Sequence, residues 1–182
     1  MSTDAPTANP LVATIRSLEQ DSALDPGVDL LAAYGEVLTA RPTVRKLLTG
    51  AWLGHSLHPA LTDLPLGAWM SASMLDLLGP EGSEDAARRL TGIGVLGALP
   101  TALSGVADWR SLSKQTDRRV GVVHAAGNSA ALAAYTCSWL ARRRGHHRLG
   151  AALALAGAGL SGAAGYLGGH LVENGTFGAE QG

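Results

Sequence analysis

The chain has 182 residues, with 14 lysines and arginines against 15 aspartates and glutamates and a formal net charge of −1. Such a balance leaves no broad basic surface, which argues against nucleic acid as a partner. Cys137 is the single cysteine. It excludes an internal disulfide, a thiolate-bound iron–sulfur cluster and a cysteine-rich zinc site within one chain.

Glycine accounts for 24 residues and aromatic residues for only 4%, an unusual composition for a water-soluble helical core. Each glycine inside a helix costs about 1 kcal/mol relative to alanine in water. In a bilayer, small residues let helices approach closely, and the absence of water enforces backbone hydrogen bonding. The composition therefore favours a membrane protein. A mean hydropathy of only +0.14 keeps a soluble bundle with buried helices as the alternative.

Residues 1–53 are predicted to form a soluble or interfacial segment. They carry acidic residues and only short apolar clusters, separated by turn signals. Residues 11–19 and 28–38 have the pattern of short amphipathic helices. The second helix carries an apolar stripe made of Leu30, Leu31, Tyr34 and Leu38. We expect this segment to rest as a cap on the membrane surface.

Residues 54–182 are predicted to form a membrane domain with four transmembrane helices. The stretches 90–107, 120–141 and 149–172 contain no formal charge, and each is close to the roughly 20 apolar residues that span a bilayer. A fourth stretch, 59–79, has the right length but contains Asp63, Pro65 and Asp76. The predicted fold is all-α: an antiparallel four-helix transmembrane bundle behind short amphipathic helices.

The predicted spans leave charged residues in their connections, at 81–89, 108–119 and 142–148. Asp76 is expected to pair with the basic connections on its side of the membrane. An even number of spans places both termini on one side, which carries a slight excess of basic residues. We therefore expect a multi-pass protein of the cell membrane with cytoplasmic termini.

Four histidines are expected to gather toward one face of the membrane. In an up-down-up-down bundle, the first and third spans begin on the side where the second and fourth end. His55 and His58 lie at the start of the first span, His124 near the start of the third and His170 at the end of the fourth. The same side also holds Asp63, Asp108, Trp109 and Asn128. Ionisable groups within a membrane are costly, so they are functional candidates.

Each of these residues also has a purely structural interpretation. A single histidine at a helix end is usually an interfacial side chain. Asp63 can serve as a helix N-cap, and Asp108 can pair with Arg110 or Arg119.

Four sequence segments occur in order along the chain: WLGHSLHPALTDLPLGAW, ALSGVADW, RRVGVVHAAGNSAAL and GYLGGHLV. With them the chain resembles the bacterial membrane proteins grouped as domain-of-unknown-function family 2231, from about residue 49 to residue 172. The family's histidines correspond to His55, His58, His124 and His170, and its Asp–Trp pair to Asp108 and Trp109. Some members are fused to a Rieske iron–sulfur domain, which implies redox partners. This chain has no Cys-x-His pair, and Ser56 replaces the usual proline.

The sharper functional hypothesis is a membrane protein that binds haem b for electron transfer. Imidazoles from two helices can ligate iron from opposite sides of a porphyrin, and glycine-rich helix surfaces leave room for the ring. His124 and His170 are the first ligand pair, with His58 as the main rival and His55 as a further candidate. Arg110 or Arg119 would meet the propionates. The residues expected to orient the imidazole N–H groups are Asp63, Asp108 and Asn128.

Two alternatives use the same residues. His55, His58, His124 and His170 could together hold copper, zinc or iron. The chain could instead be a non-catalytic scaffold or accessory subunit with hydrogen-bonded histidines, and small residues in the fourth span could pack a homodimer. No nucleophile–base arrangement or phosphate-binding loop is present, so neither a hydrolase nor a transferase is indicated, and enzymatic activity stays open.

Overall fold

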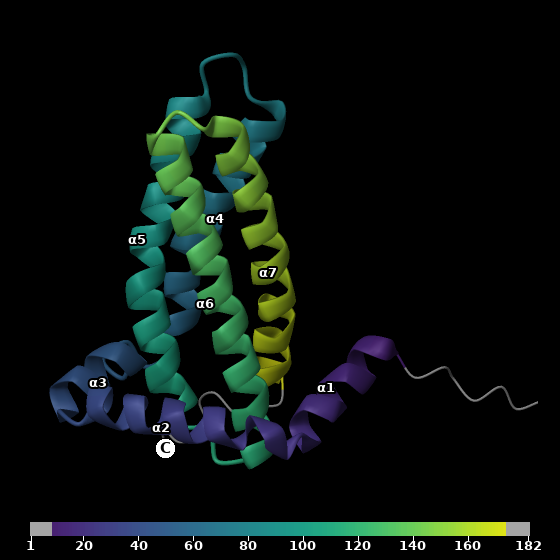
Figure 1. Ribbon diagram of the computed structural model, residues 1–182. Coiled ribbons are helices and arrows are strands. Elements are labelled where there is room, and N and C mark those ends of the chain that lie inside the picture. The colour runs from purple at the N-terminus through teal and green to yellow at the C-terminus, as the bar shows by residue number, and fades with distance from the viewer. Residues whose placement is uncertain (1–8, 174–182) are drawn as a thin grey trace, which may run out of the picture.

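The computed structural model describes residues 9–173, and helices make up almost all of this range (Figure 1). No strand occurs within it, so the all-α prediction is confirmed. Three short helices come first: α1 (Pro10–Gln20), α2 (Asp25–Thr39) and α3 (Pro42–Thr49), with the 3-10 turn η1 (Ser22–Leu24) between α1 and α2. Four long helices follow: α4 (His58–Leu78), α5 (Glu84–Trp109), α6 (Gln115–Arg143) and α7 (His147–Glu173).

The four long helices form an antiparallel bundle made of two hairpins. Helix α4 packs along α5, and α6 packs along α7. The hairpins meet where α5 faces α6 and α4 faces α7. The two hairpin loops lie at one end of the bundle, and α1 to α3 lie at the other end (Figure 1). Helices α4 and α6 therefore both begin at the end that carries the short helices.

Two of the four long helices, α5 and α7, are long and apolar enough to cross a membrane. The uncharged stretches 90–107 and 149–172 lie within them, so these two predicted spans are supported. Helix α4 is interrupted by acidic residues, and α6 carries polar side chains along its length, so neither reaches the same hydropathy. The structure thus supports an all-α protein with two candidate spans, which is less than the predicted four.

The short helices form a cap against the end of the bundle. Helix α2 lies across this end, α3 lies beside α5, and α1 extends past α6 and α7 (Figure 1). Val28 of α2 is buried with Trp109 and Leu112, and Ile15 of α1 is buried with Val120 and Leu171. Burial of these apolar side chains holds the cap in place.

Only part of the apolar stripe predicted for α2 packs on the bundle: Leu31 lies against the buried cluster of Val28, Trp109 and Leu112, and Leu38 is half-buried. Leu30 is 75% exposed and Tyr34 is 51% exposed, whereas Val28, Gly35 and Thr39 are buried. Gly35 allows α2 to pack closely on the bundle, because a Cβ at this position would lie only 2.8 Å from Cδ of Arg110. A small residue lets α2 approach the bundle on a side that hydrophobicity alone does not mark.

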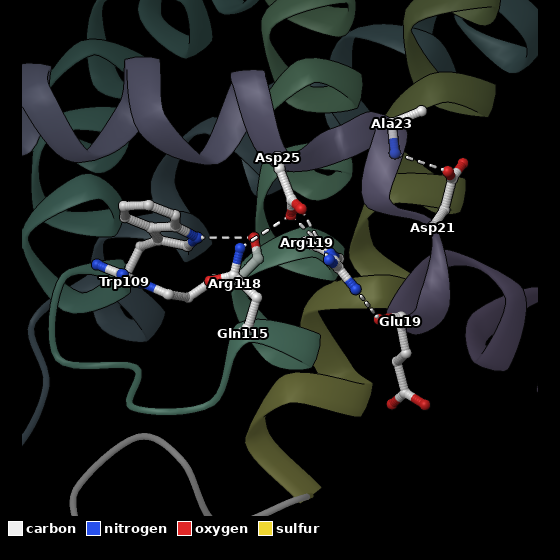
Figure 2. Close-up of polar contacts among 8 residues, drawn as sticks. All are labelled: Glu19, Asp21, Ala23, Asp25, Trp109, Gln115, Arg118 and Arg119. Atoms are coloured by element: carbon white, nitrogen blue, oxygen red, sulfur yellow. Dashed lines mark hydrogen bonds and ion pairs between the residues drawn. The ribbon is translucent and has the colours of Figure 1, made fainter.

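A polar cluster fixes the junction between the cap and α6 (Figure 2). The Arg119 guanidinium donates to both carboxylate oxygens of Asp25, at 2.8 and 2.9 Å, and to the backbone oxygen of Glu19 at 3.0 Å. Gln115 also donates to Asp25. Beside this cluster, Trp109 donates to the backbone oxygen of Arg118 at 3.1 Å. The cluster ties α1 and α2 to the first turns of α6.

The two hairpins carry corresponding residues at equal spacings. In α4 and α6 the equivalent residues share the same spacing: His58, Trp69 and Asp76 correspond to His124, Tyr135 and Arg142. In α5 and α7 the corresponding set is Gly94, Thr101 and Gly105 against Gly157, Ala164 and Gly168. The contacts repeat as well, because Gly94 packs under Trp69 and Gly157 packs under Tyr135.

Three pairs of these equivalent residues contact each other between α4 and α6. The rings of His58 and His124 lie 6.4 Å apart between centroids. Trp69 stacks on Tyr135 at 3.9 Å with an interplanar angle of 5°. Arg142 Nη1 donates to Asp76 Oδ1 at 2.7 Å. A residue that meets its own counterpart lies on a two-fold axis, so a pseudo-two-fold axis runs along the bundle between α4 and α6.

Candidate cofactor site

His58 begins α4 and points toward α5. Its Nδ1 lies 2.9 Å from the backbone oxygen of Thr101. A carbonyl oxygen only accepts hydrogen bonds, so Nδ1 carries the proton and Nε2 presents a lone pair. Gly105, one turn further along α5, makes room for the ring, because a Cβ there would lie 2.8 Å from Cε1 of His58.

His124 has the same environment in the second hairpin. Its Nδ1 lies 2.7 Å from the backbone oxygen of Ala164 in α7, and a Cβ on Gly168 would lie 2.8 Å from its Cε1. Its Nε2 therefore also presents a lone pair. Asn128 Nδ2 lies 3.2 Å from this Nε2, which matches an amide donating to an imidazole acceptor.

Each imidazole is thus oriented by a backbone carbonyl of its own hairpin. A histidine that ligates a metal usually donates its other ring N–H to a carbonyl or carboxylate, which fixes the tautomer and the direction of the ligating nitrogen. His58 and His124 both satisfy this requirement, and their rings are inclined at 82° to each other. The structure brings two imidazoles together on the pseudo-two-fold axis: Nε2 of His58 has no protein partner among the described residues, whereas Nε2 of His124 accepts from Asn128.

The other two candidate histidines lie elsewhere. His55 is exposed, and its Nδ1 lies 2.9 Å from the backbone oxygen of Ser56 in the connection before α4. His170 lies near the end of α7, where its Nε2 is 3.1 Å from Oε1 of Glu19 in α1. The same end of the bundle carries all four histidines, but only His58 and His124 face each other. The first predicted ligand pair, His124 with His170, is not the pair that the fold places together.

Neither arginine proposed for haem propionates faces this histidine pair. Arg119 is engaged by Asp25 and by the backbone of Glu19. The exposed Arg110 lays its methylene groups over Gly35 of α2. Both side chains hold the cap on the bundle, a role that sequence spacing does not reveal because their partners lie far away in the chain.

The three residues expected to orient the imidazoles behave differently from one another. Asn128 contacts His124, but its amide Nδ2 donates to Nε2 instead of Asn128 accepting the imidazole N–H. Asp63 is exposed on α4. Asp108 is buried, and its carboxylate accepts a hydrogen bond from Ser56 rather than pairing with Arg110 or Arg119. The carbonyls of Thr101 and Ala164 take the orienting role that the carboxylates were expected to fill.

A scan against protein-family models matches residues 54–181 to the family described as predicted membrane protein, DUF2231. The chain belongs to this family. The resemblance inferred from its four sequence segments is therefore confirmed. No curated protein and no solved structure matches the chain.

The donor set of this DUF2231 member limits which group it can hold. Within residues 9–173, no three side chains of histidine, cysteine, aspartate or glutamate gather closely enough to bind a metal ion. A structural zinc site takes four protein ligands, and a catalytic one takes three. Haem iron needs only one or two axial ligands from the protein, because the porphyrin supplies the others. The pair His58 and His124 offers fewer ligands than such a zinc site takes from the protein and as many as haem iron takes.

Several residues of the site cannot be predicted from the sequence. Thr101 and Ala164 contribute only backbone oxygens, so their side chains give no signal. Gly105 and Gly168 are hidden among many other glycines. A signal does exist in the spacing, because both histidines precede an aromatic residue by the same interval, Trp69 in one hairpin and Tyr135 in the other.

Proposed function

We propose that this DUF2231 member is a four-span integral membrane protein that binds haem b between its two hairpins, with His58 and His124 as axial ligands, and takes part in electron transfer. The carrying observation is the pair of facing imidazoles, each with Nδ1 bonded to a carbonyl of its own hairpin. Nε2 of His58 has no protein partner among the described residues, and Nε2 of His124 contacts only the amide of Asn128. Haem supplies a one-electron couple when bound. The chain's own residues position the imidazole nitrogens through the carbonyls of Thr101 and Ala164.

The spacing of the imidazoles supports this proposal. Two imidazoles that held one group together would have to lie close to each other at the same depth in the bundle. The centroids of His58 and His124 are 6.4 Å apart. His58 and His124 come from different hairpins, so a shared ligand would also join the hairpins.

The arrangement of the hairpins supports the proposal of four spans. Helices α5 and α7 meet the requirements for a membrane span, and each packs along its whole hairpin partner. Two polar pairs of α4 and α6 turn toward one another: Asp76 meets Arg142, and His58 meets His124. Asp63 lies exposed near the start of α4. Polar side chains that face the interior of a bundle are compatible with a membrane. We place the termini on the cytoplasmic side and assign the electron partner to the iron–sulfur class that the resemblance implies.

The scaffold alternative explains less of the geometry. Structural histidines in a hydrogen-bonded network would be expected to use both ring nitrogens. Nε2 of His58 has no protein partner among the described residues, whereas its Nδ1 is fully engaged. An available, pre-oriented lone pair is the feature that a ligand site requires.

Absorption spectroscopy on detergent-purified full-length protein tests the proposal. After haem-supplemented expression, we expect a Soret band and sharp longer-wavelength bands on reduction, because two imidazole ligands give low-spin iron. His58→Ala and His124→Ala should each lose the low-spin spectrum, while His170→Ala and His146→Ala should retain it. Protein that remains colourless would overturn the haem assignment. Equal loss in His170→Ala would show that the ligand pair is wrong.

A further inference from the structure

The buried ion pair at the far end of the bundle also lies on the pseudo-two-fold axis. The Arg142 side chain is 0% exposed and that of Asp76 is 10% exposed. Arg142 donates through Nη1 and Nη2 to the two carboxylate oxygens of Asp76 and through Nε to Ser138. A Cβ at Gly150 would collide with the Arg142 side chain. The ion pair is therefore buried and closely packed by neighbouring residues.

Opposite charges at equivalent positions make the two hairpins complementary rather than identical. The repeats match closely elsewhere on the axis, where imidazole meets imidazole and aromatic ring meets aromatic ring. A surface that nearly matches its own copy can also pair with that copy. Two α4–α5 hairpins would then bring Asp76 against a second Asp76, and two α6–α7 hairpins would bring two Arg142 side chains together.

Like charges in a buried site are strongly unfavourable, because neither charge is compensated. We infer that the Asp76–Arg142 pair is a specificity determinant for hairpin pairing: it directs α4–α5 to pair with α6–α7 and excludes pairing of either hairpin with its own copy from a second chain. The surface of α4–α5 that carries Asp76 thus fits the α6–α7 hairpin, which carries Arg142. The short connection between α5 and α6 supplies that partner within one chain at high effective concentration.

Charge reversal in the full-length protein tests this inference without reference to any cofactor. Asp76→Arg and Arg142→Asp should each lower Tm by roughly 10 °C or more, because each leaves like charges in a buried site. The double variant D76R/R142D restores opposite charges and should recover most of the loss. The matched control is Asp85→Arg, because Asp85 is 56% exposed and pairs with Arg88 and Arg89 on the surface. Its Tm should change little.

Co-expression of two differently tagged chains separates specificity from stability. In the Asp76→Arg chain both positions are basic, and in the Arg142→Asp chain both are acidic, so opposite charges can meet only between the two chains. Affinity purification through one tag should therefore recover the other tag as well. Neither single variant should co-purify with a differently tagged copy of itself. Unchanged Tm in both single variants, or absence of recovery in the double variant, would overturn the inference. If the single variants fail to accumulate, accumulation of the double variant decides the question.

Discussion

At the scale of single residues, the site depends on two glycines as much as on two histidines. Gly105 and Gly168 occupy equivalent places, each beside Cε1 of an imidazole. Neither glycine is needed for backbone conformation, since both lie inside helices. Their role is to leave space in which each ring reaches a carbonyl of the neighbouring helix.

Adding one methyl group at either glycine should therefore displace an imidazole. In Gly105→Ala or Gly168→Ala the new Cβ would lie 2.8 Å from Cε1 of His58 or His124, too close for ordinary contact. We expect a loss of about 1–3 kcal/mol in stability from overpacking, together with reduced haem occupancy. Thermal unfolding and the Soret absorbance measure the two effects.

Gly67→Ala and Gly162→Ala are the matched controls, because a Cβ at either position meets nothing within 4 Å. They should leave stability unchanged or raise it by up to about 1 kcal/mol, since alanine is the better helix former. If Gly105→Ala and Gly168→Ala behave like these controls, the rings have more freedom than the packing indicates.

The sequence indicates which candidate residues lie at this end of the bundle, but not which of them face each other. His58, His124 and Asn128 were all identified, because span topology gives the depth of each residue along the bundle. Choosing between His58 and His170 as the partner of His124 requires the rotation of each helix about its own axis. That rotation is set by close contacts, such as Gly168 against His124 and Glu19 against His170, which hydropathy does not encode.

At the scale of elements, the cap is held to the bundle by charge as well as by apolar burial. Asp25 at the start of α2 pairs with Arg119 in the second turn of α6. The hydrogen bonds from Arg119, and then the one from Gln115, hold the pKa of Asp25 below its ordinary value of 3.8. A lowered pKa means that the contact favours the ionised form and that protonation weakens it.

Acidification should consequently loosen the cap. The contribution of Asp25 is fully present above about pH 4 and is lost as pH falls through the still lower pKa of the folded state. Asp25→Asn should speed hydrogen exchange in α1 and α2 a few-fold at neutral pH and remove this acid-dependent step. Asp29→Asn, an exposed position on the same helix, should do neither. Identical exchange in both variants would mean that apolar packing alone holds the cap.

At the scale of the whole molecule, the four long helices were predictable and the repeat that organises them was not. Uncharged stretches and charged connections mark the long helices directly. The repeat is obscured because equivalent residues differ in type: Trp69 matches Tyr135, and Asp76 matches Arg142. The equivalent positions are recognised only from the contacts in the structure. Two residues that meet on the pseudo-two-fold axis have to be complementary, but they do not have to be of the same type.

Reporter fusions should resolve the predicted membrane topology. Fusions after Gly50 and Ser113 should report the cytoplasmic side, and fusions after Gly82 and Gly145 the opposite side, because the hairpin loops lie together at one end of the bundle. A reporter that places Gly82 and Ser113 on the same side would rule out α5 as a span. Full-length protein that stays monodisperse without detergent would rule out a membrane protein.

The direction of the repeats has a consequence for what the bundle can do across a membrane. Helices α4 and α6 begin at the same end, so the two halves are related by rotation about the bundle axis rather than by inversion. In transporters with inverted halves, exchange of conformation between the halves opens the binding site to the opposite compartment. Exchange between parallel halves only rotates the molecule and leaves the histidines at the same face. The repeat therefore keeps the His58–His124 pair at one end of the bundle and the Asp76–Arg142 pair at the other.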